Sequence, residues 1–196
     1  MSLAAPTIMT HGSDELRTRI LHPTITGEIT WTQLFSEPGA GSDLAGLSTT
    51  AVRDGDDFVV NGQKVWNTSA HHADFGMLLA RTDWDVPKHH GISYFVLPME
   101  QPGVEVRPIL QMNGHSSFNE VFLTDVRVPV ANLVGDSGDG WRVARTTLMH
   151  ERTFATLRRP SFAAGANGRT IEEAAAEAAD HFATYAWYPQ RAGRAD

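Results

Sequence analysis

The chain has 196 residues, of which 41% are hydrophobic and 20% charged, and its formal net charge is −7. This composition is typical of a globular protein with one well-formed core, and the absence of a Lys/Arg cluster argues against a nucleic-acid partner. The sequence contains no cysteine, which excludes disulfides and a thiol nucleophile, and it has no long apolar run or apolar leader, so we expect a cytoplasmic protein without a membrane span.

The first predicted element is a short helix. Ser13 is placed to cap a helix that runs from Asp14 to about Leu21, because serine side chains accept hydrogen bonds from the free N–H groups of a first turn. Leu16 would lie on the buried face, and Pro23 would follow the end of the helix. The N-terminal part is therefore predicted to be helical.

A β-rich region follows, from residue 27 to residue 129. Asp54-Gly55 and Asn61-Gly62 are typical hairpin turns, and strands do not alternate with helices in this region, so the glycines do not form a Rossmann turn. The pattern predicts a mainly β fold, an antiparallel sandwich or barrel with helical segments at both ends. The predicted strands are residues 29–35, 47–53, 58–61, 63–67, 76–82, 92–97, 104–109 and 118–128.

Helical periodicity returns after Gly140. One predicted face carries Trp141, Ala144, Leu148, Glu151 and Ala155. The general interpretation of Glu151 is an ion pair with Arg152 or another cation at the edge of the apolar stripe. Burial on this face would instead raise the pKa of Glu151 towards the range of a general base.

The last forty residues are predicted as a linker and a helix. Residues 158–168 contain arginines, proline, glycine and alanine and form a plausible linker. Thr170 and Glu173 fit a capping box that starts a helix reaching about Tyr185. Its apolar face would be available for association with another chain.

Two segments carry the strongest functional signal. Residues 37–43 read Glu-Pro-Gly-Ala-Gly-Ser-Asp, and residues 61–68 read Asn-Gly-Gln-Lys-Val-Trp-Asn-Thr. Glycines let a backbone rich in N–H groups approach a ligand closely. Trp66 and Thr68 would lie on one face of a strand, where one could cover a ring and the other bond its edge. Together the segments point to a flavin site.

The nine histidines suggest no metal site. The pairs His71-His72 and His89-His90 would point to opposite faces of a strand, and no carboxylate or thiol lies at the spacing of a known zinc site. We therefore assign none of them to a metal and expect both pairs in surface loops.

The two segments together resemble the middle domain of the acyl-CoA dehydrogenases. The resemblance covers roughly residues 10–155 and includes, in the order of the family, residues 11–13, 27–28, 102–104, 119–122, 125–129, 138–141 and 151–152. It implies that residues 1–25 end an N-terminal helical domain, residues 26–136 form the β domain that binds FAD and acyl-CoA, and residues 137–196 begin an incomplete C-terminal helical domain. The chain is about half as long as the family's chains, so it resembles a fragment or short form.

The resemblance implies an activity. Members of the family convert an acyl-CoA thioester to the trans-2-enoyl-CoA with FAD as cofactor, form oligomers and pass electrons to an electron-transferring flavoprotein. Glu151 matches the base of a subgroup that includes the isovaleryl and long-chain types, whereas most members take their base from the C-terminal bundle. Ser42 and Arg152 match substrate contacts. The residues that match flavin contacts are Gln33, Phe35, Ser36, Gly41, Ser42, Trp66, Asn67 and Thr68.

Other interpretations stay open at this point. Ser42 and Asp43 could cap a turn, Trp66 could belong to the core, and Thr68 could be an ordinary strand residue. The chain could be a truncated or partner-dependent subunit without catalysis, or a flavin oxidase or monooxygenase of the same fold. The length and branching of the acyl group are not decided by the sequence.

Overall fold

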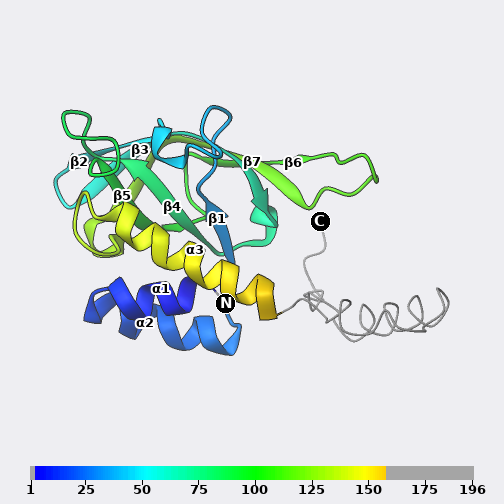
Figure 1. The fold of residues 1–196 in the computed structure, drawn as a ribbon, viewed down its shortest axis with the longest axis horizontal. Helices are drawn as coiled ribbons and strands as arrows, with labels where there is room; N and C mark the ends of the chain where they lie inside the picture. Colours follow the sequence, from blue (N-terminus) through cyan, green and yellow to red (C-terminus); the bar gives the residue numbers. More distant parts are fainter. Residues whose placement is uncertain (1–2, 158–196) are drawn as a thin grey trace. The chain divides into compact units, whose positions relative to one another are not determined.

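The structure is a computed structural model that describes residues 3–157 (Figure 1). The chain divides into two compact units, Met1–Phe154 and Ala155–Asp196, and the features below belong to the first. The linker predicted at residues 158–168 and the helix predicted from Thr170 lie outside the described residues. The three-domain division proposed from the sequence stays a prediction.

The described part is mainly β, as predicted. Seven strands form one curved sheet in the order β1-β4-β2-β3-β7-β6, and β5 pairs with β4 (Figure 1). The strands are β1 Trp31–Leu34, β2 Thr50–Asp54, β3 Asp57–Thr68, β4 Phe75–Arg81, β5 Ile92–Pro98, β6 Val104–Ile109 and β7 Phe118–Pro129. Most pairs are antiparallel, but β1 pairs with β4 in parallel, and so does one residue of β2, which the sequence did not predict.

The sheet separates two apolar cores. Strand β4 is buried along most of its length, and its side chains alternate between the two faces. Met77 and Leu79 lie in the core that the helices cover, whereas Leu78 and Ala80 lie in the core enclosed with β3 and β7. This double burial fixes the middle of the sheet and therefore the strands beside it.

The predicted helix after Ser13 is present but longer than expected. The helix α2 is Asp14–Thr26, and the Leu16 N–H donates to Ser13 Oγ at 3.1 Å, which confirms the cap. The prediction that Pro23 follows the helix is wrong, because Pro23 lies inside it and the left-handed Gly27, with φ of 78°, ends it. A further helix, α1 Ala4–His11, precedes it and was not predicted.

Strand β3 corrects one turn prediction. Asp54 pairs with Asp57 across a tight turn at Gly55, so the first predicted hairpin is confirmed. Asn61-Gly62 is not a hairpin, because β3 continues through it with a bulge against β7. A Cβ at Gly62 would lie 2.7 Å from Thr49 Cα, so this glycine serves a close backbone approach and not a turn.

The predicted helix after Gly140 is α3 Gly140–Leu157, and its buried face differs from the prediction. Val143, Ala144 and Thr147 are buried, and the Thr147 hydroxyl lies 2.9 Å from Thr7 Oγ1 and 3.3 Å from Tyr94 Oη. Glu151 is exposed, so the expected burial of its carboxylate is wrong. The buried stripe ends one turn before it.

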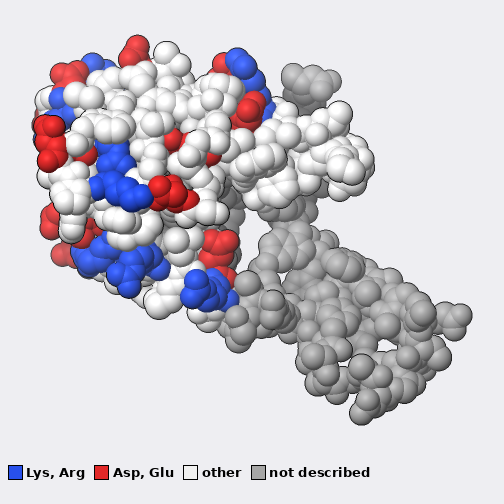
Figure 2. All heavy atoms as spheres, turned by 45° about the horizontal axis from the view of Figure 1, so that its top comes forward, with Lys and Arg blue, Asp and Glu red and all other residues white. Residues whose placement is uncertain are grey.

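The surface combines charged and uncharged areas. On the face drawn in Figure 2, acidic and basic side chains lie among broad uncharged areas. Several charges form exposed pairs, such as Arg127 with Asp54 at 2.7 Å and Arg107 with Glu105 at 2.7 Å. Exposed pairs of this kind contribute about 0–1 kcal/mol each, so the stability of this unit comes mainly from its two cores.

Both histidine pairs lie at the surface, as predicted. His71 and His72 are exposed in a short 3₁₀ turn, η2 Ala70–His72, and His89 and His90 are exposed before β5. Within residues 3–157, no group of three or more His, Asp or Glu side chains is placed to hold a metal ion. In the same range, no helix is both long and apolar enough to cross a membrane.

Candidate functional site

A pocket of about 220 Å³ lies where the end of β1, the end of β3 and α3 meet. Six residues singled out in the sequence line it, and Val65 is the one that sequence reasoning missed. The lining residues are Gln33, Phe35, Ser36, Val65, Trp66, Thr68 and Glu151. The structure therefore brings residues that directly precede the first motif segment together with residues of the second segment and with Glu151.

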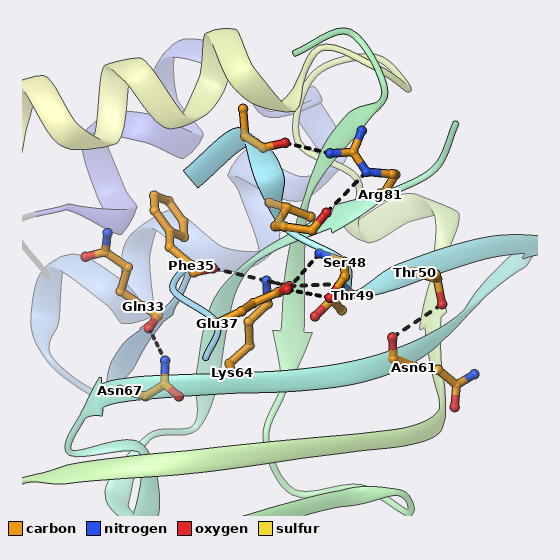
Figure 3. A network of polar contacts seen from close by, with 12 residues as sticks. Gln33, Phe35, Glu37, Ser48, Thr49, Thr50, Asn61, Lys64, Asn67 and Arg81 are labelled. Carbon is orange, nitrogen blue, oxygen red and sulfur yellow. Dashed lines mark hydrogen bonds and ion pairs between the residues drawn. The ribbon is translucent and has the colours of Figure 1, made fainter. Parts of the chain in front are cut away.

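Two hydrogen bonds to backbone carbonyls hold the end of β1 and the segment after it against β3. The Val65 N–H donates to the Ser36 carbonyl at 2.9 Å. The side-chain amide of the buried Asn67 donates to the Gln33 carbonyl at 2.8 Å, on the left of Figure 3. Asn67 does not line the pocket but fixes one of its walls, and its own Oδ1 is buried with no partner within residues 3–157.

Trp66 owes its position to a second bulge in β3. The register with β7 shifts between Lys64 and Asn67, and Trp66 adopts a left-handed φ of 62°, which is rare for an aromatic residue. Its side chain is 61% exposed and meets Phe118 edge-on, with ring centroids 6.2 Å apart. The bulge holds a large apolar ring at the pocket instead of in the core.

Two hydroxyls of the pocket carry free hydrogen-bonding capacity. Ser36 is half-buried and Thr68 is exposed, and neither side-chain oxygen has a partner within residues 3–157. A ring with carbonyl and nitrogen edges could accept hydrogen bonds from both. The pocket thus combines an aromatic face with two donors.

Besides Asn67, three predicted residues do not line this pocket. Gly41 and Ser42 lie in an exposed turn after Ala40, and Arg152 is exposed on α3 next to Glu151. Beside Ser42, the Asp43 carboxylate is paired with Lys88 Nζ at 2.7 and 2.8 Å. Any contact of these residues with a ligand would be made outside the pocket.

The two motif segments are joined by a buried ion pair that sequence reasoning missed. Lys64 Nζ lies 2.8 Å from Glu37 Oε1 and donates to the Phe35 carbonyl at 3.1 Å, and both side chains are almost fully buried (Figure 3). Glu37 also accepts from Ser48 N at 2.7 Å and Thr49 N at 2.9 Å. The sequence did carry a signal for this pair, because one segment contains the acidic Glu37 and the other the basic Lys64.

Both members of the pair are charged at neutral pH. Burial favours the neutral form of Glu37, but the charge and hydrogen bond of Lys64 and the donors from Thr49 and Ser48 outweigh it and lower its pKa to about 2. Burial lowers the pKa of Lys64 to about 8 against the attraction of Glu37. The bonds that the carboxylate receives make the ionised pair the stable form.

Comparison with known proteins identifies the fold around this pocket. The family model described as acyl-CoA dehydrogenase, middle domain, matches residues 32–126, which contain both motif segments. This chain belongs to the acyl-CoA dehydrogenase family. The resemblance inferred from the two segments is thereby confirmed.

Individual acyl-CoA dehydrogenases match over most of the chain. Acyl-CoA dehydrogenase FadE34 of Mycobacterium tuberculosis is 56% identical over 149 residues, which are 76% of this chain and 21% of that protein. The solved Tcur3481-Tcur3483 steroid ACAD is 40% identical, with a TM-score of 0.74 over 77% of this chain and 39% of that one. The ChsE4-ChsE5 complex from Mycobacterium tuberculosis is 44% identical, with a TM-score of 0.71 over 76% and 38%.

This chain thus spans about a fifth of FadE34 and about two fifths of the chains in those solved structures. The residues that the family model matches, 32–126, include most of the curved sheet. Activity, substrate and partners of the longer proteins are therefore properties to be tested for this chain.

Proposed function

We propose that this chain binds FAD at the pocket between β1, β3 and α3 and takes part in the α,β-dehydrogenation of an acyl-CoA thioester to the trans-2-enoyl-CoA. One observation carries the proposal. Phe35 and Ser36 after β1, Trp66 and Thr68 at the end of β3, and Glu151 on α3 line a single pocket.

The pocket suits the ring system of a flavin. Its volume of about 220 Å³ lies below the roughly 300–1,000 Å³ of pockets that enclose whole drug-sized ligands, so it can take a ring system and not an entire dinucleotide. Trp66 offers an exposed aromatic face, and Ser36 and Thr68 offer hydroxyls without other partners within residues 3–157. The residues present fit the group.

The chemical roles divide between the cofactor and the protein. Bound FAD supplies the hydride acceptor that no side chain provides. Trp66 would pack against its ring system, and Ser36 and Thr68 would bond its edge. Gln33 would face the same edge, and Asn67 would hold the wall behind it.

Glu151 is the proposed base. Glu151 lines the pocket, and it forms no ion pair in the part of the chain that the structure describes. A carboxylate in this position can take the α-proton of a thioester that lies between it and the flavin ring. Removal of that proton is the step that depends on Glu151.

The remaining residue roles are proposals from the family resemblance. Gly41 and Ser42 would contact the cofactor outside the pocket, and Ser42 and Arg152 would contact the substrate. The electron acceptor would be an electron-transferring flavoprotein, the chain would act in a homo- or hetero-oligomer, and the location would be cytoplasmic. A solved relative titled a steroid ACAD makes steroid-linked acyl-CoA thioesters candidates beside straight and branched ones.

The test is an anaerobic titration of the FAD-loaded full chain with straight-chain, branched and steroid-linked acyl-CoA thioesters. We expect at least one thioester to bleach the flavin absorbance of the wild type. Glu151→Gln should bind FAD equally well but bleach about 100-fold more slowly or less, as expected for loss of a general base. The exposed Glu100→Gln is the matched control and should behave as wild type.

Two results would contradict the proposal. Equal bleaching rates in Glu151→Gln and wild type would exclude Glu151 as the base. A folded wild-type chain that binds FAD but is bleached by no thioester would exclude the dehydrogenase reaction for this chain alone.

A further inference from the structure

Both members of the Glu37–Lys64 pair are next to pocket residues in the sequence. Lys64 precedes the pocket residues Val65 and Trp66 on β3, and Glu37 follows the pocket residues Phe35 and Ser36. Neither charged side chain lines the pocket. The pair is therefore placed to act on the pocket only through its neighbours in the chain.

We propose that Lys64 is a positioning residue, which holds the Phe35–Ser36 wall against Val65 and Trp66 and so sets the width of the pocket. Its consequence for flavin binding rests on the proposed function. The ammonium group donates to the Phe35 carbonyl at 3.1 Å and to Glu37 Oε1 at 2.8 Å (Figure 3). The Lys64 side chain thus bonds the residue before Ser36 and the residue after it.

Glu37 extends the connection to a third segment. Its two oxygens accept from the backbone N–H of Ser48 and of Thr49 and from the Ser48 hydroxyl. Residues 48 and 49 lead into β2, which pairs with β3. The wall is therefore anchored to the sheet by Lys64 on one side and by residues 48–49 on the other.

Full burial makes the loss of either member of the Glu37–Lys64 pair costly. The Lys64 side chain is 0% exposed and that of Glu37 3%, so no water can replace a lost partner without a change in structure. The backbone bond from Val65 N–H to the Ser36 carbonyl, at 2.9 Å, closes the same junction. If Lys64 positions the wall, loss of its ammonium must weaken this neighbouring bond more than bonds elsewhere.

Replacement of Lys64 and replacement of Glu37 should loosen different segments. Lys64→Met removes the donor to the Phe35 carbonyl and should loosen residues 35–36. Glu37→Gln leaves that donor in place and should act first on the N–H groups of Ser48 and Thr49. A purely structural role in stability would not separate the two segments.

The experiment is amide hydrogen exchange of the full chain, with and without FAD, for wild type and Lys64→Met. Two controls are matched to it: Val128→Ala removes buried apolar volume from the other core, and Arg107→Met removes the cation of the exposed Arg107–Glu105 pair. Because one partner of a buried pair left alone can prevent folding, the double variant Glu37→Gln/Lys64→Met is included, which leaves no unpaired buried charge and still lacks the donor.

We expect the Val65 amide to exchange about tenfold faster or more in either Lys64 variant, relative to a Val128→Ala protein of equal stability. The dissociation constant for FAD should rise by about tenfold or more, and Arg107→Met should change neither quantity.

Uniform loss of protection, as in Val128→Ala, would overturn the proposal. Selective exchange at Val65 with an unchanged FAD affinity would also overturn it. A wild-type chain that binds no FAD would contradict the proposed function, and the exchange comparison would then decide alone: a selective change at Val65 supports the positioning role, and a uniform change overturns it.

Discussion

Glu37 shows how a single residue couples the stability of this chain to pH. Its folded-state pKa of about 2 lies below the ordinary value of 4.5, because Lys64 and the donors of residues 48–49 favour the carboxylate despite its burial. A lowered folded-state pKa stabilises the protein fully above pH 4.5, and this contribution is lost as pH falls through about 2.

We therefore predict that the free energy of unfolding of wild type falls between about pH 4.5 and pH 2 more steeply than that of Glu37→Gln/Lys64→Met, which leaves no unpaired buried charge. Urea denaturation at several pH values measures it. Other carboxylates add their own slope to both proteins, so the difference between the two curves is the relevant quantity. Parallel curves would contradict the ionised pair described above.

At the residue scale, roles that depend on local chemistry were predictable from the sequence, whereas roles that depend on distant neighbours were not. Ser13 was recognised as a cap because a helix start depends on local chemistry. Gly62 was misread because its reason is the backbone of Thr49, a neighbour that only the folded sheet brings close. The Glu37–Lys64 pair escaped prediction for the same reason, since the two residues meet only through packing.

At the scale of elements, the second bulge of β3 places Trp66 at the pocket. A left-handed conformation costs an aromatic residue roughly 1–3 kcal/mol, and the 61% exposed side chain of Trp66 returns little by burial. Such strain is typical of functional positions. The bulge thus places the ring where a ligand can meet it.

We predict that Trp66→Gly leaves the free energy of unfolding unchanged or raises it, because glycine adopts a left-handed φ without strain. Trp84→Gly is the matched control, since Trp84 is 62% exposed, lies away from the pocket and packs against Arg81. Trp84→Gly should lower the free energy of unfolding, because the contact with Arg81 is lost. A loss in Trp66→Gly as large as in the control would show that the bulge is not strained.

The end of β3 was partly predictable. The spacing of Trp66 and Thr68 predicted that both would face one side, and both line the pocket. The bulge between Lys64 and Asn67 was not predictable, because the residues opposite it in β7 are more than fifty positions away in the sequence. Helix α3 was predicted from periodicity, but its buried face consists of Val143, Ala144 and Thr147.

At the scale of the whole described unit, α3 depends on one buried threonine. Thr147 contacts Thr7 of α1 at 2.9 Å and Tyr94 of β5 at 3.3 Å, so a single hydroxyl of α3 contacts both a second helix and the sheet. Burial raises the pKa of Tyr94, so its hydroxyl stays protonated and needs a partner.

We predict that Thr147→Val lowers the free energy of unfolding by about 1–3 kcal/mol, because the buried Tyr94 hydroxyl loses its partner. Thr153→Val on the same helix is the control, since Thr153 is exposed and bonds only the Met149 carbonyl. Chemical denaturation should show a loss in the first variant alone. Equal losses would mean that helix propensity, and not the buried contact, accounts for the change.

The fold of the whole unit was largely predictable because its turn chemistry and strand spacing are local. The parallel pairing of β1 with β4 was not, since pairing direction depends on the path of the chain between the strands. The family resemblance grouped Glu151 with Phe35, Trp66 and Thr68, and these residues line one pocket, but burial of its carboxylate was wrong, because the apolar stripe of α3 ends before it.

The central claim is that the pocket between β1, β3 and α3 binds the flavin ring, and the most direct measurement is a titration of the purified full chain with FAD, followed by quenching of flavin fluorescence. We predict one FAD per chain for wild type and for Trp84→Gly, and an affinity at least about tenfold weaker for Trp66→Gly. Absence of FAD binding by a folded wild-type chain, or equal affinity in all three proteins, would contradict the claim.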